Sequence, residues 1–313
     1  MAGSSPIRTM RNRTIFTVAL LSIALANGAA GQSEASDPTP TIVPANTRLF
    51  DRIIANQKRD EAALEVYERI ERLEIRKNPN DANPSSIKIA RVIPSGTGMA
   101  RIPVGADGKP TNAAAYRANL EKLERALALL VNDGRSQHDA VERYAKKRKD
   151  RSDVIEATRN AFLFTFVADE PRGERVLSKY KMEPNPAFKP TSRFTSIFRK
   201  VHGFVWVDEA AGELARIEGE VTEDISVALF LGKIYKGSHF MQERYEFPPG
   251  LWLPSFSQYD FDGRKLFSGF SIHERTFYSN YRYIGTPKEA LEAIRSELGQ
   301  DDLGNAGAGA SDP

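Results

Sequence analysis

The stretch "GFVWVDEAAGELARIEGEV" (residues 203–221) predicts two strands joined by a tight loop. Residues 204–207 are all apolar, and residues 214–221 alternate between two faces, with charges on one of them. Gly212 lies in the loop, where a left-handed residue is needed. The apolar face of such a hairpin needs a partner, which is either more of the protein or a molecule that the protein binds.

The N-terminus predicts an exported protein. Three arginines and no acid precede the apolar run Thr14–Ala26, which is too short to span a membrane comfortably. Ala24 and Ala26 form a plausible cleavage signature. We therefore expect residues 1–30 to be a cleaved signal peptide, rather than a retained anchor, and the mature protein to reside in the periplasm.

The chain contains no cysteine, which excludes a disulfide framework and a lipidated export signal. We expect a free protein, not lipidated, that is stabilised by an ordinary hydrophobic core. The formal charge of +3 equals the three arginines of the leader, so the mature chain has 41 basic and 41 acidic residues. This balance gives no global electrostatic argument for nucleic-acid binding.

The pattern along the chain predicts one domain with a helical insertion. Residues 31–45 form a polar, proline-rich spacer that we expect to be disordered. Apolar residues at helical spacing predict a long helix from Asn46 to about Lys77. We place the single domain at residues 46–299, the insertion at about 111–161 and a disordered tail at 300–313.

Helix signals are clear at several points. Thr111 or Asn112 begins one helix of the insertion, Ser136 caps a second, and a third runs over about residues 154–161. The last helix has a capping box in Thr286–Glu289, with proline at its first position, and Gly299 is placed to close it.

From about residue 162 onward the chain is mostly β. Successive strands are separated by strong turn signals, which include Pro248-Pro249-Gly250 and Asp262-Gly263. We therefore predict an α+β fold: a curved antiparallel sheet, in the form of a half-open barrel, with the N-terminal helix and the insertion lying across its concave face.

No catalytic or metal-binding constellation is evident, and we predict neither an enzyme nor a cofactor. The four histidines lie in different segments, and none has a second His or Cys at metal-ligand spacing. Asp260 and Asp262 would suit a calcium site or a general acid, but turn geometry is the favoured explanation. No nucleophile elbow or phosphate loop is present.

One basic run stands out in the insertion. It contains Lys146, Lys147, Arg148 and Lys149. These side chains could contact anionic lipid head groups or an acidic protein partner, whereas a solvated helix face is the simpler and favoured explanation.

Two segments resemble a known group of envelope proteins. "GFVWVDEAAGELARIEGEV" is similar to a hairpin found in outer-membrane lipoprotein-sorting and lipoprotein-carrier proteins, the LolA/LolB-like superfamily. "GLWLPSFSQYDFDG" and "FSGFSIHERTFYSNYRYI" resemble the strands that follow in that group, so the resemblance covers about Arg172 to Ile284. It implies a half-open antiparallel barrel with helices across its open side, a concave cavity for acyl chains, a periplasmic location and no enzyme activity.

The chain departs from that family in two respects. The helical insertion is longer than a simple carrier needs. The arginine with which such carriers hold their lid closed has no matching local motif; Arg101 and Arg175 are candidates.

Two hypotheses follow. The first is a periplasmic carrier for lipid or acylated cargo, held by apolar side chains of the concave face. The expected ligand-binding residues are Phe204, Trp206, Met241, Tyr245, Trp252, Phe256 and Phe267. The alternative is an envelope protein-interaction module on the same fold, in which the cavity is filled by its own side chains and the insertion recruits a protein partner.

Overall fold

The computed structural model describes residues 47–308, apart from residues 136, 228–231, 248 and 266–267. The predicted signal peptide and spacer, the predicted cap at Ser136 and the first proline of the predicted turn at 248–250 lie outside the described residues. Within the described part, no helix combines the length and the apolar character needed to cross a membrane.

The described chain is a mixture of helices and many strands. The helices are α1 (Thr47–Ala63), α2 (Ala113–Asn132), α3 (His138–Ala161), the short α4 (Arg193–Ser196) and α5 (Pro287–Ala308), with a 3₁₀ turn at Ile197–Lys200. The strands are β1 (Tyr67–Ile75), β2 (Ser86–Pro94), β3 (Met99–Pro103), β4 (Phe162–Arg172), β5 (Arg175–Pro184), β6 (Val201–Asp208), β7 (Glu213–Val221), β8 (Ile225–Val227), β9 (Gly232–Ile234), β10 (His239–Glu246), β11 (Trp252–Lys265) and β12 (Ser268–Tyr283).

The strands form one 12-stranded sheet with the order β3-β2-β1-β12-β11-β10-β7-β6-β5-β4, and β8 and β9 join it beside β11. The described pairings are antiparallel. Among the described residues the two end strands, β3 and β4, do not pair with each other, so the sheet is not closed into a barrel. The predicted α+β class with an open antiparallel sheet is confirmed.

The chain forms two compact units, which we call the first and the second unit. The first comprises residues up to Lys58, Lys149–Arg244 and Gln258–His273. The second comprises Arg59–Arg148, Tyr245–Ser257 and residues from Glu274 onward. Each unit has a hydrophobic cluster of its own.

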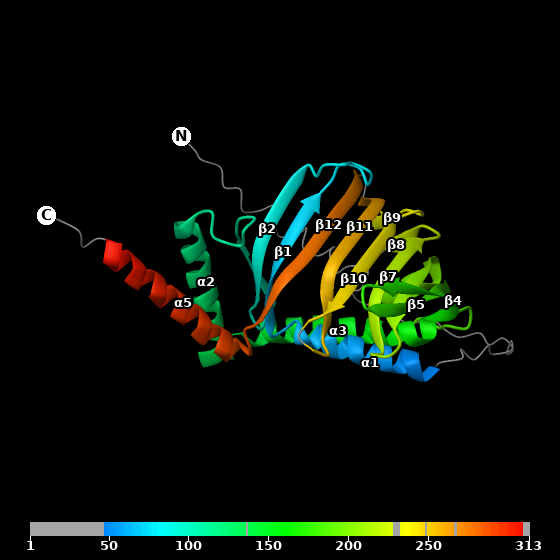
Figure 1. Ribbon diagram of the computed structural model, residues 1–313, viewed down its shortest axis with the longest axis horizontal. Helices are drawn as coiled ribbons and strands as arrows, with labels where there is room; N and C mark the ends of the chain where they lie inside the picture. The colour runs from blue at the N-terminus through cyan, green and yellow to red at the C-terminus, as the bar shows by residue number, and fades with distance from the viewer. Residues whose placement is uncertain (1–46, 136, 228–231, 248, 266–267, 309–313) are drawn as a thin grey trace. The chain divides into compact units, whose positions relative to one another are not determined.

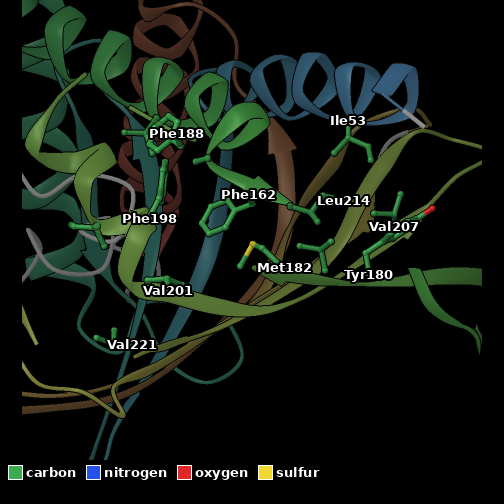
Figure 2. Packing of buried hydrophobic residues seen from close by; sticks show 14 of the residues in the cluster. Ile53, Phe162, Tyr180, Met182, Phe188, Phe198, Val201, Val207, Leu214 and Val221 are labelled. Carbon is green, nitrogen blue, oxygen red and sulfur yellow. The ribbon is translucent and has the colours of Figure 1, made fainter. Parts of the chain in front are cut away.

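The cluster of the first unit lies between one face of its strands and two helices. Leu49 and Ile53 of α1 and Val154 of α3 pack against side chains from β4 to β9 and from the segment before β6. Figure 2 shows Ile53 on the side of α1 that faces Leu214 and Val207. Aromatic residues are frequent in this cluster: Phe162, Tyr180, Phe188 and Phe198.

The cluster of the second unit is mainly aliphatic. Leu120, Leu123 and Leu127 of α2 pack with Leu291 and Ile294 of α5 and with apolar residues of β2 and β3. Figure 1 shows α2 and α5 side by side. Leu120, Leu127 and Ile294 are fully buried.

Several local predictions are confirmed. Asn112 caps α2, because its side chain accepts a hydrogen bond from the Ala115 amide at 2.9 Å. The capping box of α5 is present, and the Thr286 amide donates to Glu289 Oε2 at 2.7 Å. Gly212 has φ +72 in the turn between β6 and β7, as the sequence pattern requires.

The predicted long N-terminal helix is wrong beyond Ala63. Residues 67–75 form strand β1, which pairs with β2 on one side and with β12 on the other. The apolar residues of "YERIERLEI", Tyr67, Ile70, Leu73 and Ile75, approximate helical spacing, and pairing with strands on both sides overrides that pattern.

Three boundary predictions are also wrong. Asp262 and Gly263 do not form a turn but lie inside β11, where Gly263 pairs with Ile234 of β9. A Cβ on Gly263 would lie 2.1 Å from the Lys233 carbonyl oxygen, so glycine is needed there for strand contact. The two helices expected after Ser136 are one continuous helix, α3, and α5 continues through Gly299 to Ala308.

Candidate functional site

A stripe of aromatic residues on β4 leads from the core of the first unit to the surface. Phe162, Phe164 and Phe166 alternate along the strand and therefore share one face. Phe162 is 5 % exposed, Phe164 is half-buried and Phe166 is 53 % exposed. Because β4 is an end strand, this face of the cluster opens at the edge of the sheet.

Two further rings extend the stripe. Phe50 of α1 stacks on Phe164 with ring centroids 4.2 Å apart and meets Tyr180 of β5 edge-on at 5.4 Å. Tyr180 also lies edge-on to Phe166 at 5.7 Å. We call Phe50, Phe162, Phe164, Phe166 and Tyr180 the aromatic stripe.

The Tyr180 hydroxyl fixes the stripe to the β6–β7 turn. It donates to Glu209 Oε1 at 2.5 Å. Burial, followed by Glu209, raises the pKa of Tyr180 well above its ordinary value, so the phenol stays protonated. The stripe therefore has a neutral, hydrogen-bonded end beside an apolar surface.

Helix α1 is attached to the same turn by polar contacts. Arg52 donates to the carbonyl of Glu209, and Asn56 donates to the carbonyl of Gly212 at 2.9 Å. Gly212 comes so close to Arg52 that a Cβ would lie 2.0 Å from Nε. Glycine is thus needed here both for its positive φ and for this approach.

Ion pairs join α1 to α3 over the cluster. Lys58 pairs with Glu156 at 3.1 Å and Arg159 with Asp51 at 2.8 Å. These side chains line a shallow groove of about 330 Å³ between the helices. Their side chains are 38 to 51 % exposed, and exposed pairs contribute only about 0–1 kcal/mol each, so they resist separation of the helices weakly.

The interior beneath the helices is occupied by side chains of the protein itself. Met182 and Val207 are almost completely buried there, and Figure 2 shows Phe162 and Met182 near the centre of the view. A bound apolar chain would therefore displace or spread these side chains. The Met182 side chain can adapt to such a change, because methionine is unbranched and has three rotatable bonds.

Three of the expected ligand-binding residues lie on the other face of the sheet. Val205 and Ile217 belong to the cluster and pair across β6 and β7, so Phe204 and Trp206 point to the opposite side. Met241 shares that side, because its strand neighbour Phe240 packs on the cluster. The expectation that Trp206 faces the helix-covered interior is not met, because Trp206 is one residue out of phase with the core-facing valines.

Charged side chains surround Trp206 on that outer face. Lys179 Nζ lies 4.7 Å and Arg216 Cζ 4.8 Å from the indole ring, and the indole N–H donates to Glu170 Oε2 at 2.7 Å. The hydrogen bond from Trp206 and the neighbouring Lys179 lower the pKa of Glu170. Trp206 is only 7 % exposed because these charged groups cover it.

The remaining expected residues do not join this group. Tyr245, Trp252 and Phe256 belong to the second unit, where Trp252 is buried and Tyr245 is exposed. Phe256 lies 5.0 Å from the ring of Phe277. Phe267 is outside the described residues. Ligand binding by the seven residues stays a prediction.

The basic run lies on an exposed surface of α3. Lys146, Lys147, Arg148 and Lys149 are all exposed, and Lys149 forms an ion pair with Asp153 one turn later at 2.5 Å. The neighbouring Tyr144 is buried instead, and its hydroxyl donates to Glu65 at 2.8 Å. This geometry suits either a solvated face or a contact surface.

The two arginine candidates for a lid contact both have carboxylate partners. Arg101 pairs with Glu71 at 3.1 Å in the second unit, and Arg175 pairs with the buried Asp208 at 2.6 Å in the first. Neither arginine contacts α1 or α3 in these pairs, so no lid role is transferred to them.

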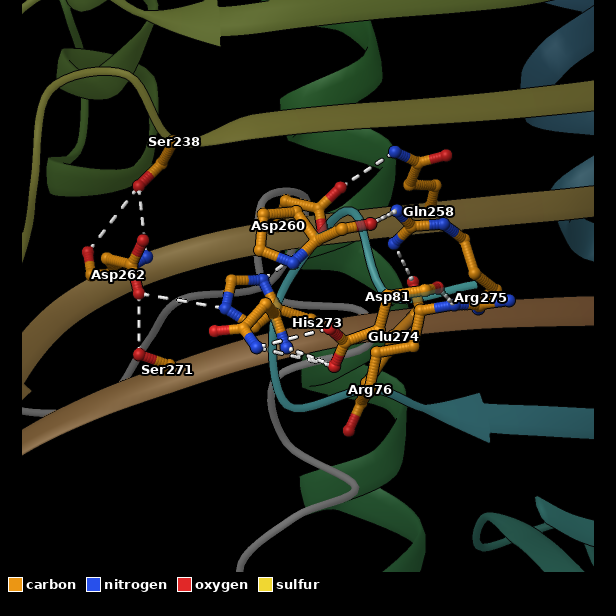
Figure 3. A network of polar contacts seen from close by, with 12 residues as sticks. Arg76, Asp81, Ser238, Gln258, Asp260, Asp262, Ser271, His273, Glu274 and Arg275 are labelled. Carbon is orange, nitrogen blue, oxygen red and sulfur yellow. Dashed lines mark hydrogen bonds and ion pairs between the residues drawn. The ribbon is translucent and has the colours of Figure 1, made fainter. Parts of the chain in front are cut away.

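Asp260 and Asp262 contact a buried histidine. His273 is 4 % exposed; its Nδ1 lies 3.2 Å from Asp260 Oδ1 and its Nε2 3.8 Å from Asp262 Oδ1. Figure 3 shows Ser271 and His273 at the same carboxylate oxygen of Asp262, to which Ser271 donates at 2.5 Å. Within the described residues no group of three or more His, Cys, Asp or Glu side chains is arranged to hold a metal. The cluster joins β11 to β12.

The sequence did contain a signal for the aromatic stripe. "FLFTFV" alternates large aromatic residues over residues 162–167, which is typical of a strand with one apolar face. What the pattern could not indicate is that β4 would be an end strand, and hence that the stripe would reach solvent.

Comparison with known proteins finds similarity to two solved structures. No family model and no curated protein matches the chain. Among solved structures, the chain is similar to a LolA superfamily protein from Nitrosomonas europaea, at 9 % identity and a TM-score of 0.31 over 80 % of this chain and 97 % of that one. It is also similar to an outer-membrane lipoprotein-sorting protein domain from Vibrio parahaemolyticus, at 11 % identity and a TM-score of 0.29 over 74 % and 90 %. At these scores we base no functional argument on either structure.

Proposed function

We propose that the protein is a periplasmic binding or carrier protein for a hydrophobic cargo with an acyl chain. The cargo would occupy the helix-covered face of the first unit and reach it at the edge of the sheet. The observation that supports this best is the aromatic stripe, in which exposure increases from 5 % at Phe162 to 53 % at Phe166.

Burial of an acyl chain can provide the affinity. Each buried CH₂ contributes about 0.8 kcal/mol, so a chain of ten or so carbons needs no specific polar contact. Opening the interior requires the separation of α1 from the β6–β7 turn and from α3. The polar contacts there are two exposed ion pairs and three side-chain hydrogen bonds to carbonyls, which are individually weak in water. The larger cost is the exposure of Leu49 and Ile53, which α1 buries in the cluster.

Export and delivery complete the proposal. A cleaved signal peptide would bring the protein to the periplasm, and the exposed basic run of α3 would contact an anionic membrane surface or an acidic protein partner. Neither step needs an enzyme activity.

The test is binding of a fluorescent fatty acid to the purified mature protein, followed by displacement with unlabelled oleate. The double variant Phe164→Ser and Phe166→Ser should weaken binding roughly 10- to 100-fold, because it removes the apolar surface of the stripe. Ile87→Ser is the matched control: Ile87 is 46 % exposed on β2 of the second unit, so its loss should leave affinity unchanged. A wild-type protein that binds no probe and carries no lipid in native mass spectrometry would contradict the proposal.

A second function has an observation in its favour. The cluster of the first unit is filled by its own side chains, as expected of an envelope protein-interaction module that carries no cargo. In that case crosslinking in cells should recover one dominant protein partner, lost when Lys146, Lys147 and Lys149 are changed to Glu. The wild-type protein would then not bind the fatty-acid probe.

A further inference from the structure

The second unit contains a buried arginine whose hydrogen-bonding capacity is only partly used. Arg69 of β1 is 7 % exposed. Its Nε and Nη2 both donate to one oxygen of Glu71, at 3.0 and 2.6 Å. Its Nη1 is buried and has no hydrogen-bond acceptor among the residues that the structure describes. A buried, charged donor without an acceptor is costly and calls for a partner.

The charges around Arg69 do not balance. The other oxygen of Glu71 accepts from Arg101, with Arg101 Nε at 3.1 Å. Two guanidinium groups thus share one carboxylate, which leaves one positive charge in excess. Burial lowers the pKa of Arg69, but Glu71 outweighs it and the pKa is raised, so the guanidinium is charged.

Aromatic and hydroxyl groups border the arginine. The Arg69 guanidinium carbon lies 6.0 Å from the ring centre of Tyr278. The Tyr278 hydroxyl is 3.0 Å from Ser257 Oγ, and the Tyr281 hydroxyl donates to the Pro254 carbonyl at 2.8 Å. The tyrosine hydroxyls therefore have other partners, and the guanidinium is left to bind a further acceptor.

We propose that Arg69 binds the oxyanion of a small carboxylate or phosphate monoanion in the second unit. Glu71 occupies the Nε–Nη2 edge of the guanidinium, so the Nη1–Nη2 edge is the one that offers a second, bidentate fork. A single negative charge neutralises the excess. Arg101, which shares Glu71 with Arg69, has a side chain that is 38 % exposed on β3, an end strand of the sheet.

This site is independent of the acyl-chain proposal. All of its residues belong to the second unit, whereas the aromatic stripe belongs to the first. Loss of one binding activity should therefore leave the other unchanged.

The test uses the mature protein with two probes, sodium acetate and inorganic phosphate at pH 6, which separate the carboxylate from the phosphate source. Binding is measured by calorimetry and by the arginine side-chain resonances in ¹⁵N NMR. We expect one probe at least to shift the Arg69 resonances. Arg69→Met should weaken its binding roughly 10- to 100-fold, and Arg69→Lys less, since it keeps the charge but loses the fork.

The control is Arg72→Met. Arg72 lies on the same strand, is 41 % exposed and pairs with Glu74. Its change should leave anion affinity unaltered. Glu71→Gln should instead raise the affinity for the anion, because it removes the carboxylate that competes for Arg69. If neither anion shifts the Arg69 resonances, or if Arg69→Met and Arg72→Met bind equally well, the proposal is wrong and Nη1 is satisfied by water.

Discussion

The two units of the protein bury apolar surface in different ways. In the first, aromatic rings and a methionine lie under helices that are fastened by exposed ion pairs, and the stripe on β4 reaches the surface. In the second, leucine and isoleucine side chains of α2 and α5 interlock, and the most buried of them have no exposure at all. The first cluster therefore has an exposed aromatic edge, whereas the second is a closed aliphatic core.

Because of this difference, the residues that determine stability should not be the ones that determine apolar binding. Substitutions in the second unit should affect unfolding without affecting apolar binding. Substitutions at the edge of the first unit should do the reverse, because an exposed ring contributes little to folding but provides surface to a ligand.

The largest effect is expected at Leu120 in α2. Leu120 is 0 % exposed, and Leu120→Ala should lower the free energy of unfolding by roughly 2–5 kcal/mol, because it leaves a cavity in the aliphatic cluster. Urea unfolding measures this change. Leu129→Ala, at a side chain of the same helix that is 50 % exposed, is the control and should change stability by less than about 0.5 kcal/mol.

Gly212→Ala should destabilise the first unit by roughly 1–2 kcal/mol through its positive φ, with a further cost from displacement of Arg52. Gly237→Ala serves as the control, because Gly237 has φ +84 but no neighbouring atom within 4 Å of the place that a Cβ would take. If urea unfolding shows the same loss of stability for both variants, the contact between α1 and the β6–β7 turn contributes nothing to the free energy of unfolding.

The free energy of unfolding of the second unit should fall at low pH, because Glu71 becomes protonated there. Burial raises the pKa of Glu71, but Arg69 and Arg101 outweigh this and lower it below its ordinary value. Its contribution is therefore fully present above the ordinary glutamate range and is lost as the pH falls through the lowered value. Unfolding free energies between pH 7 and pH 3 should fall, and Glu71→Gln should flatten that slope. An unchanged slope would show that the ion pairs of Arg69 and Arg101 with Glu71 do not contribute.

The smallest effect is expected at the basic run. Changing Lys146, Lys147 and Lys149 to Glu should abolish weak binding to anionic vesicles at low salt without altering stability, since all three side chains are exposed. Equal vesicle binding by wild type and variant would identify the run as a solvated helix face.

Local sequence signals predicted the parts of the fold that depend on one turn or one cap. Gly212, Asn112 and the Thr286–Glu289 box each satisfy backbone geometry by themselves, so their roles follow from neighbouring residues. Residues 67–75 could not be assigned in this way, because their apolar spacing approximates that of a helix and the strand depends on pairing with β2 and β12.

The candidate site was harder to predict for the same reason. Trp206 and Phe166 are both large aromatic residues on strands, and only register and strand order decide their environments. Register turns Trp206 to the charged outer face, and strand order leaves Phe166 at an edge. The aromatic composition indicated an apolar surface, whereas the position of that surface depends on the pairing of strands distant in sequence.

The most direct test of acyl-chain binding by the first unit is titration of Phe166→Ala with a fluorescent fatty acid, beside the wild type and Ile87→Ala. We expect Phe166→Ala to raise the dissociation constant roughly tenfold while its urea midpoint stays unchanged, and Ile87→Ala to match the wild type in both. Equal affinity in all three proteins, or no binding by the wild type, would contradict a binding role for the aromatic stripe.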